Sequence, residues 1–132
     1  MIRAIIGICS GLISAMSALF LGLMLLMGLY PIPESVENGN HDAMNLFIAS
    51  LADGAFIIKA ATHIVACFAS GLVASIVSKP YKYQAGVIAA VLVFMLVVFR
   101  DFRYLYPSAY VVCDLALSAI AGFIGVLLGS NR

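Results

Sequence analysis

The chain has 132 residues, of which 64% are apolar and 10% are charged, and its formal net charge is +1. Soluble domains are about 45–50% apolar and about 25% charged, so this composition, with a mean hydropathy of +1.14, indicates an integral membrane protein. At about 20 residues per crossing, the length allows four spans and leaves no room for a soluble domain. Because the chain has no basic run, we expect no nucleic acid partner.

The first predicted span covers residues 4–29 and stops at Tyr30, Pro31 and Pro33. Two prolines cannot continue a helix, and tyrosine favours the membrane–water interface, so Tyr30 is expected to be interfacial. The apolar run is too long for the hydrophobic core of a signal peptide, which indicates a retained span.

The next segment, residues 34–42, is polar and acidic and contains the turn-like sequence Asn38-Gly39-Asn40. Its acidic side chains lack EF-hand spacing, so we expect a solvated loop. A helix is expected to begin near His41 or Asp42, to lie partly at the interface, and to lead into a second span over residues 47–77.

The third and fourth spans are predicted over residues 84–102 and 108–128. Around the end of the third span, Arg100, Asp101 and Arg103 occur together with aromatic residues, which is typical of an interfacial anchor. Residues 1–132 are therefore predicted to form a single all-α membrane domain: a bundle of four transmembrane helices with short loops.

An even number of spans places both termini on one side of the membrane. That side would carry four basic residues and the opposite side two, so the positive-inside rule predicts cytoplasmic termini. The four basic residues are Arg3, Lys79, Lys82 and Arg132.

At about 100° per residue, the predicted spans separate into large apolar faces and faces of small residues. Small faces are typical of helix–helix contacts in membranes. We expect the third span to be the most exposed to lipid. The residues expected at helix contacts are Gly7, Gly11, Ser70, Gly122 and Gly125.

Four ionisable residues fall within the apolar segments, namely Asp53, Lys59, His63 and Asp114. A lysine or aspartate at the centre of a span costs about 2.5–3.5 kcal/mol, which favours pairing. Asp53 and Asp114 are expected at similar depth, and Lys59 can extend back towards them. We therefore expect Lys59 to pair with Asp53 or Asp114.

Three interpretations of this cluster stay open at the level of sequence. Lys59 could neutralise the aspartates and fix how the helices meet, as a structural clamp. The cluster could instead form a proton or ion relay, because ionisable residues inside a membrane are candidates for function. It could also contact a bound lipid or small molecule.

The sequence contains no arrangement typical of a catalytic or metal site. Cys9, Cys67 and Cys113 lie in apolar segments, and neither CxxC nor HExxH spacing occurs. No nucleophile is visible beside a base. We therefore expect no enzyme activity, no cofactor and no metal.

The layout of the whole chain resembles a group of small bacterial four-span inner-membrane proteins of unknown function. The matching residues are Tyr30, Pro31 and Pro33; Ser50, Leu51, Gly54, Ala55 and Phe56; His63 and Gly71; Asp114, Gly122 and Gly125. Two features depart from that pattern: the first span has no acidic residue at its end, and Ala52-Asp53 replaces an expected proline. The resemblance implies a multi-pass protein of the bacterial inner membrane and implies no activity.

The leading functional hypothesis is a small non-catalytic membrane protein that serves as an accessory, assembly or structural subunit of a membrane complex. The alternative is a small oligomeric transporter or channel with an intramembrane Asp/Lys/His relay. The expected partners are membrane lipids and either another protein or further copies of this chain.

Overall fold

The computed structural model describes residues 1–37 and 39–132, so Asn38 of the expected turn lies outside the described residues. Within these ranges the protein is all α-helical, without strands, and the predicted fold class is confirmed. Four of the helices are long and apolar enough to cross a membrane, which identifies a multi-pass membrane protein. The elements are α1 (Ile2–Leu29), α2 (Glu34–Glu37), α3 (His41–Ser50), α4 (Asp53–Val77), α5 (Lys82–Phe102) and α6 (Ser108–Ser130).

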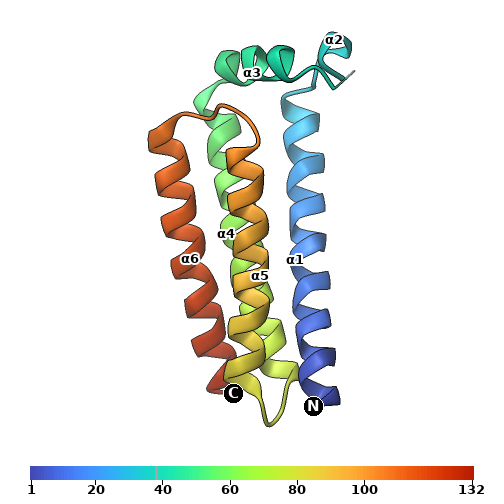
Figure 1. Cartoon of the computed structure of the whole chain (residues 1–132), viewed down its shortest axis with the longest axis vertical. Helices are drawn as coiled ribbons and strands as arrows, with labels where there is room; N and C mark the ends of the chain where they lie inside the picture. The colour runs from blue at the N-terminus through green and yellow to red at the C-terminus, as the bar shows by residue number, and fades with distance from the viewer. Residues whose placement is uncertain (38) are drawn as a thin grey trace.

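The four long helices stand side by side, and both termini lie at the same end of the bundle (Figure 1). Helices α4 and α5 each pack against the three other long helices, and α4 makes the more extensive contacts; among the described residues, α1 packs against α4 and α5. Helix α3 lies across the end of the bundle opposite the termini (Figure 1). Side chains on α4 can therefore meet residues from every other long helix.

The predicted second span, residues 47–77, is interrupted by a break between two helices. Leu51 and Ala52 have extended backbones, with ψ angles of 143° and 154°, and α4 begins only at Asp53. Helix α3 begins at His41, where the Asn40 side chain accepts hydrogen bonds from the amides of Asp42 and Ala43. The break makes α3 a separate helix at the end of the bundle.

The half of the bundle near the termini is held together by very close helix contacts. A Cβ atom added at Gly11 would lie 2.6 Å from the carbonyl oxygen of Ser70, and one at Gly125 would lie 2.3 Å from that of Phe68. Such distances mean that neighbouring backbones touch, as small residues allow in membrane helices. At Gly122 the nearest atom would be 3.5 Å away, which is ordinary van der Waals contact.

The expectation that the third span is the most lipid-exposed is wrong. In the most apolar stretch of α1, 11% of the residues are buried, compared with 39% in α5. The reason is position, since α5 packs against three helices and α1 against two.

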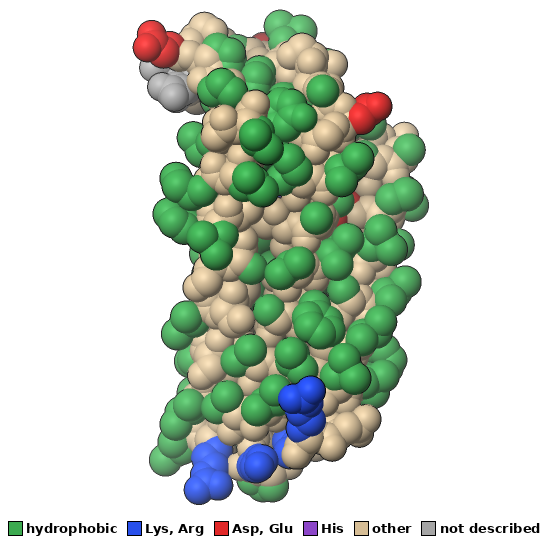
Figure 2. Space-filling model, turned by 180° about the vertical axis from the view of Figure 1, so that it is seen from behind, with side chains coloured by type: hydrophobic (Ala, Val, Ile, Leu, Met, Phe, Trp, Pro, Cys, Tyr) green, Lys and Arg blue, Asp and Glu red, His purple; other side chains and the backbone are tan. Residues whose placement is uncertain are grey.

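The surface of the bundle is dominated by hydrophobic side chains (Figure 2). On the face drawn in Figure 2, lysine and arginine side chains gather at the end that carries the termini, and acidic side chains lie at the opposite end. This separation leaves an apolar surface between two polar ends, as expected for a protein that crosses a bilayer.

Candidate functional site

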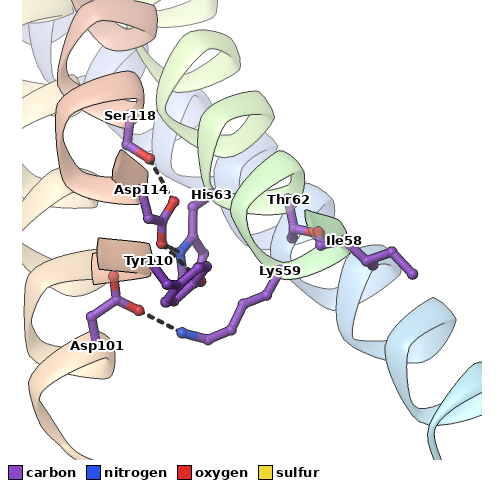
Figure 3. A network of polar contacts seen from close by, with 8 residues as sticks. All are labelled: Ile58, Lys59, Thr62, His63, Asp101, Tyr110, Asp114 and Ser118. Carbon is purple, nitrogen blue, oxygen red and sulfur yellow. Dashed lines mark hydrogen bonds and ion pairs between the residues drawn. The ribbon is translucent and has the colours of Figure 1, made fainter. Parts of the chain in front are cut away.

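A buried ion pair joins α4 to the end of α5. Lys59 Nζ lies 2.5 Å from Asp101 Oδ1 (Figure 3), and the two side chains are 11% and 0% exposed. The ammonium also lies 3.9 Å from the centre of the Tyr106 ring. Burial, together with the Asp101 carboxylate, raises the pKa of Tyr106 to about 12, so its phenol stays neutral at physiological pH. The ring can therefore stabilise the ammonium through a cation–π contact.

A second buried pair joins α4 to α6. His63 Nδ1 lies 2.6 Å from Asp114 Oδ2, and both side chains are essentially without exposure. Tyr110 donates a hydrogen bond to Asp114 Oδ2 at 3.1 Å, and Ser118 donates to Oδ1 at 3.3 Å (Figure 3). Tyr110 and Ser118 are four residues to either side of Asp114, so α6 brings both hydroxyls to its carboxylate.

The two pairs form one network, to which α4 contributes both Lys59 and His63. His63, Asp101 and Asp114 each have a potential ligand atom within 4.8 Å of the others, and all three residues are buried. One oxygen, Asp101 Oδ2, is buried without a hydrogen-bond partner in the described part of the chain. Buried carboxylate oxygens normally have donors, so this oxygen is the unsatisfied position of the network.

His63, Asp101 and Asp114 could supply ligands to a metal ion, but in this structure their ligand atoms contact other side chains of the protein. A metal needs each ligand atom about 2.0–2.2 Å away, and these positions are taken by direct contacts between side chains. The Lys59 ammonium already neutralises Asp101, and His63 contacts Asp114 at hydrogen-bond distance. A metal ion would have to break both contacts to enter.

The expected pairing of Lys59 with Asp53 or Asp114 is wrong, because Lys59 pairs with Asp101. Asp53 is the exposed first residue of α4 and lies outside the network. The predicted span over residues 47–77 placed Asp53 about two turns inside a helix, but the break at Leu51 and Ala52 puts it at a helix end. Lys59, His63 and Asp114 lie close to one another, as the sequence predicted (Figure 3).

The expectation that Asp101 is an interfacial anchor is also wrong, because Asp101 is 1% exposed. Helix α5 continues to Phe102 and carries Asp101 on its buried face, four residues after buried Val97 and eight after buried Val93. That spacing is visible in the sequence and could have indicated the burial of Asp101.

The other predicted interfacial residues lie at the end of the bundle covered by α3. Arg103 is exposed, with its guanidinium 5.6 Å from the centre of the Tyr104 ring. Arg100 is half-buried and borders a cavity. Tyr30 follows α1, and its hydroxyl packs so closely on Gly54 that a Cβ there would lie 2.6 Å away.

A cavity of about 150 Å³ lies beside the network, between α1, α3, α4 and the end of α5. Its wall is mainly apolar, but Lys59, His63 and Arg100 also border it. Towards the termini the bundle is instead closed. A Cβ at Gly86 would lie 1.9 Å from Ser75 Oγ, and one at Gly7 would lie 1.7 Å from Ser78 Oγ.

No family model matches the chain, and no match was found among the curated proteins or the solved structures that were compared with it. The site is therefore interpreted from its own geometry and chemistry. The resemblance to small bacterial four-span proteins stays a prediction.

Proposed function

We propose that the chain is a small non-catalytic membrane protein, an accessory or structural subunit of a complex in a bacterial inner membrane. The observation that carries this proposal is the internal pairing of four buried side chains, Lys59 with Asp101 and His63 with Asp114. Each of these four side chains meets its partner within the same chain, as a structural clamp requires.

The clamp acts on the relative position of three helices. Lys59 and His63 lie four residues apart on α4, and they contact Asp101 on α5 and Asp114 on α6. If α4 slid by one turn, all four groups would lose their partners in a buried environment. Buried polar pairs specify register in some other helical assemblies, and the same role is proposed here.

Close packing near the termini argues against a permanent pore through one chain. Backbone contacts at Gly11 and Gly125 leave no space for even one added carbon atom. An aqueous path through this half would require the helices to separate. The exposed apolar surface of α1 offers a face to membrane lipids, to another protein or to a second copy of the chain.

The orientation proposed here places both termini in the cytoplasm. It is supported by the basic side chains gathered at that end of the bundle (Figure 2). A reporter that is active only in the cytoplasm, fused after Arg132, should be active, and an inactive reporter on an expressed protein would reverse the orientation.

A second candidate function is an oligomeric transporter or channel with a proton or ion relay. It is favoured by Asp101 Oδ2, a buried acceptor with no donor that lies close to the His63–Asp114 pair. Such an oxygen can accept a proton, and intramembrane carboxylates commonly serve proton movement.

Ion flux in liposomes separates the two functions. The clamp predicts that proton flux through the purified wild-type protein equals that of protein-free liposomes under an imposed membrane potential. Lys59→Ala and Asp114→Asn should then alter stability without altering flux. Flux above background in the wild type, lost in either variant while circular dichroism shows that the variant is folded, would replace the clamp by the relay.

A further inference from the structure

The cavity beside the network contains a cation whose partner is not supplied by the described chain. Arg100 is half-buried at the cavity wall, and no described carboxylate lies within ion-pair distance of its guanidinium. The neighbouring carboxylate, Asp101, is already taken by Lys59. A guanidinium has five donors in a planar fork that matches a carboxylate or a phosphate, so an anion is the complementary ligand.

The charge of the surrounding groups also favours an anion. Lys59 and Arg100 both border the cavity, and the charge of Lys59 is already matched by Asp101. The Asp114 carboxylate is held by His63, Tyr110 and Ser118. Arg100 therefore brings to the cavity a positive charge that no described carboxylate pairs with, and a bound monoanion would compensate it where uncompensated charge is costly.

The rest of the cavity wall suits a hydrocarbon chain. It is formed by apolar side chains of α1 and α3, including Leu23, Leu26, Met44, Phe47 and Ile48. A cavity of roughly 150 Å³ holds a molecule the size of benzene, so this one can hold a head group or the first few carbons of a chain.

A longer chain can leave the cavity on the side of α1 that faces lipid. Leu23 and Met27 line the cavity, and each is 38% exposed on the apolar surface of the bundle. The contact between α1 and α4 is closed beside the cavity, because a Cβ at Gly22 would lie 2.1 Å from Thr62 Oγ1. An acyl chain would therefore leave the cavity past Leu23 and Met27.

We infer that this cavity binds a single-chain amphipathic anion, such as a fatty acid or a lysophospholipid with a terminal phosphate, with the anionic group on Arg100. The apolar part of the ligand lies against α1 and α3 and extends past Leu23 and Met27 towards lipid. This site is independent of the proposed clamp, because Arg100 belongs to neither buried pair.

The test uses the absence of tryptophan from the chain. Phe47→Trp places a fluorophore on the cavity wall, and Leu46→Trp, one residue earlier and 74% exposed, serves as the matched control. Brominated stearate is titrated into each protein in phosphatidylcholine liposomes, where bromine quenches nearby tryptophan. We expect saturable quenching at Phe47→Trp and a non-saturating response, due to partition into lipid, at Leu46→Trp.

Neighbouring arginines provide the second control. In the Phe47→Trp background, Arg100→Gln should weaken binding by about tenfold or more, because the charge-assisted hydrogen bonds to the anion are lost. Arg103→Gln should leave binding unchanged, because Arg103 is exposed and is not among the residues that line the cavity. Arg100→Lys should restore part of the affinity, which separates loss of the charge from damage to the fold.

Competition identifies the head group. Unlabelled stearate and lysophosphatidate should relieve the quenching, and the stronger competitor identifies carboxylate or phosphate as the preferred group. Stearyl alcohol, which has the same chain and no charge, should not compete. Equal competition by stearyl alcohol, equal effects of Arg100→Gln and Arg103→Gln, or the same response from both tryptophan positions would each overturn the inference.

Discussion

Asp114 shows how much a single buried residue can organise in this bundle. Its carboxylate receives hydrogen bonds from His63 on α4 and from Tyr110 and Ser118 on its own helix. An ionised carboxylate can accept about four hydrogen bonds, so these three donors satisfy most of its capacity where water is excluded. The residue therefore links α6 to α4 and also fixes two side chains along α6.

Replacing this carboxylate should weaken the folded state. Asp114→Asn keeps the shape but removes the charge, and one of the three donors then faces an amide NH₂ group. We expect a loss of about 2 kcal/mol in the free energy of unfolding, because hydrogen bonds to charged groups contribute about 1.5–3 kcal/mol. Unfolding by SDS in mixed micelles, followed by circular dichroism, measures the change.

Asp53→Asn is the matched control for this substitution. Asp53 is exposed at the first residue of α4 and belongs to neither buried pair. Its replacement should leave the unfolding curve nearly unchanged, as is usual for surface positions. If Asp53→Asn destabilised the protein as much as Asp114→Asn, the different roles assigned to these aspartates would be wrong.

Among the elements, α4 and α6 depend on glycine where they cross. A Cβ at Gly125 would lie 2.3 Å from the carbonyl oxygen of Phe68, and one at Gly129 would lie 2.6 Å from that of Leu72. These partners are backbone atoms of α4, so they cannot move aside as a flexible side chain would. The two helices must separate to admit any side chain at these positions.

Gly125→Ala should therefore cost about 1–3 kcal/mol of stability, the usual range for overpacking. Gly28→Ala, near the end of α1, is the control, because no heavy atom of the described residues lies within 4 Å of the added carbon. There the change should stabilise α1 by about 0.5–1 kcal/mol, because alanine favours a helix more than glycine does. Equal effects of the two substitutions in the unfolding assay would refute the close crossing of α4 and α6.

The elements also reveal which features the sequence could predict. Hydropathy predicted four long apolar helices, and the proline-rich stretch after Leu29 predicted where α1 ends. The small-residue pattern predicted buried positions such as Gly7, Gly11, Ser70 and Gly125, because periodicity and residue size are local properties.

Partners in the charge network could not be predicted as readily, because they depend on where helices break and end. Two extended residues, Leu51 and Ala52, separate α3 from α4 and leave Asp53 on the surface. The third span was predicted to reach residue 102, where α5 ends, but the charged residues at its end were expected at the interface, and this missed the burial of Asp101. Because these helix boundaries decide which carboxylates are buried, Lys59 pairs with Asp101 and not with Asp53 or Asp114.

For the molecule as a whole, the two ends of the bundle have different properties. Near the termini the helices touch through glycine and serine, and basic side chains mark the surface (Figure 2). At the end beneath α3, a cavity adjoins the two buried side-chain pairs that connect α4 to α5 and α6. The proposed function depends on these pairs being fixed contacts within the folded protein.

A double-mutant cycle on Lys59 and Asp101 tests that claim most directly. Lys59→Met and Asp101→Leu should each cost about 3 kcal/mol in the free energy of unfolding, because each leaves one charge buried without its partner. The double variant removes both charges, and we expect it to be more stable than the sum of the single losses predicts by about 1–3 kcal/mol. If the two losses add to within about 0.5 kcal/mol, the residues do not interact and the fixed clamp is contradicted.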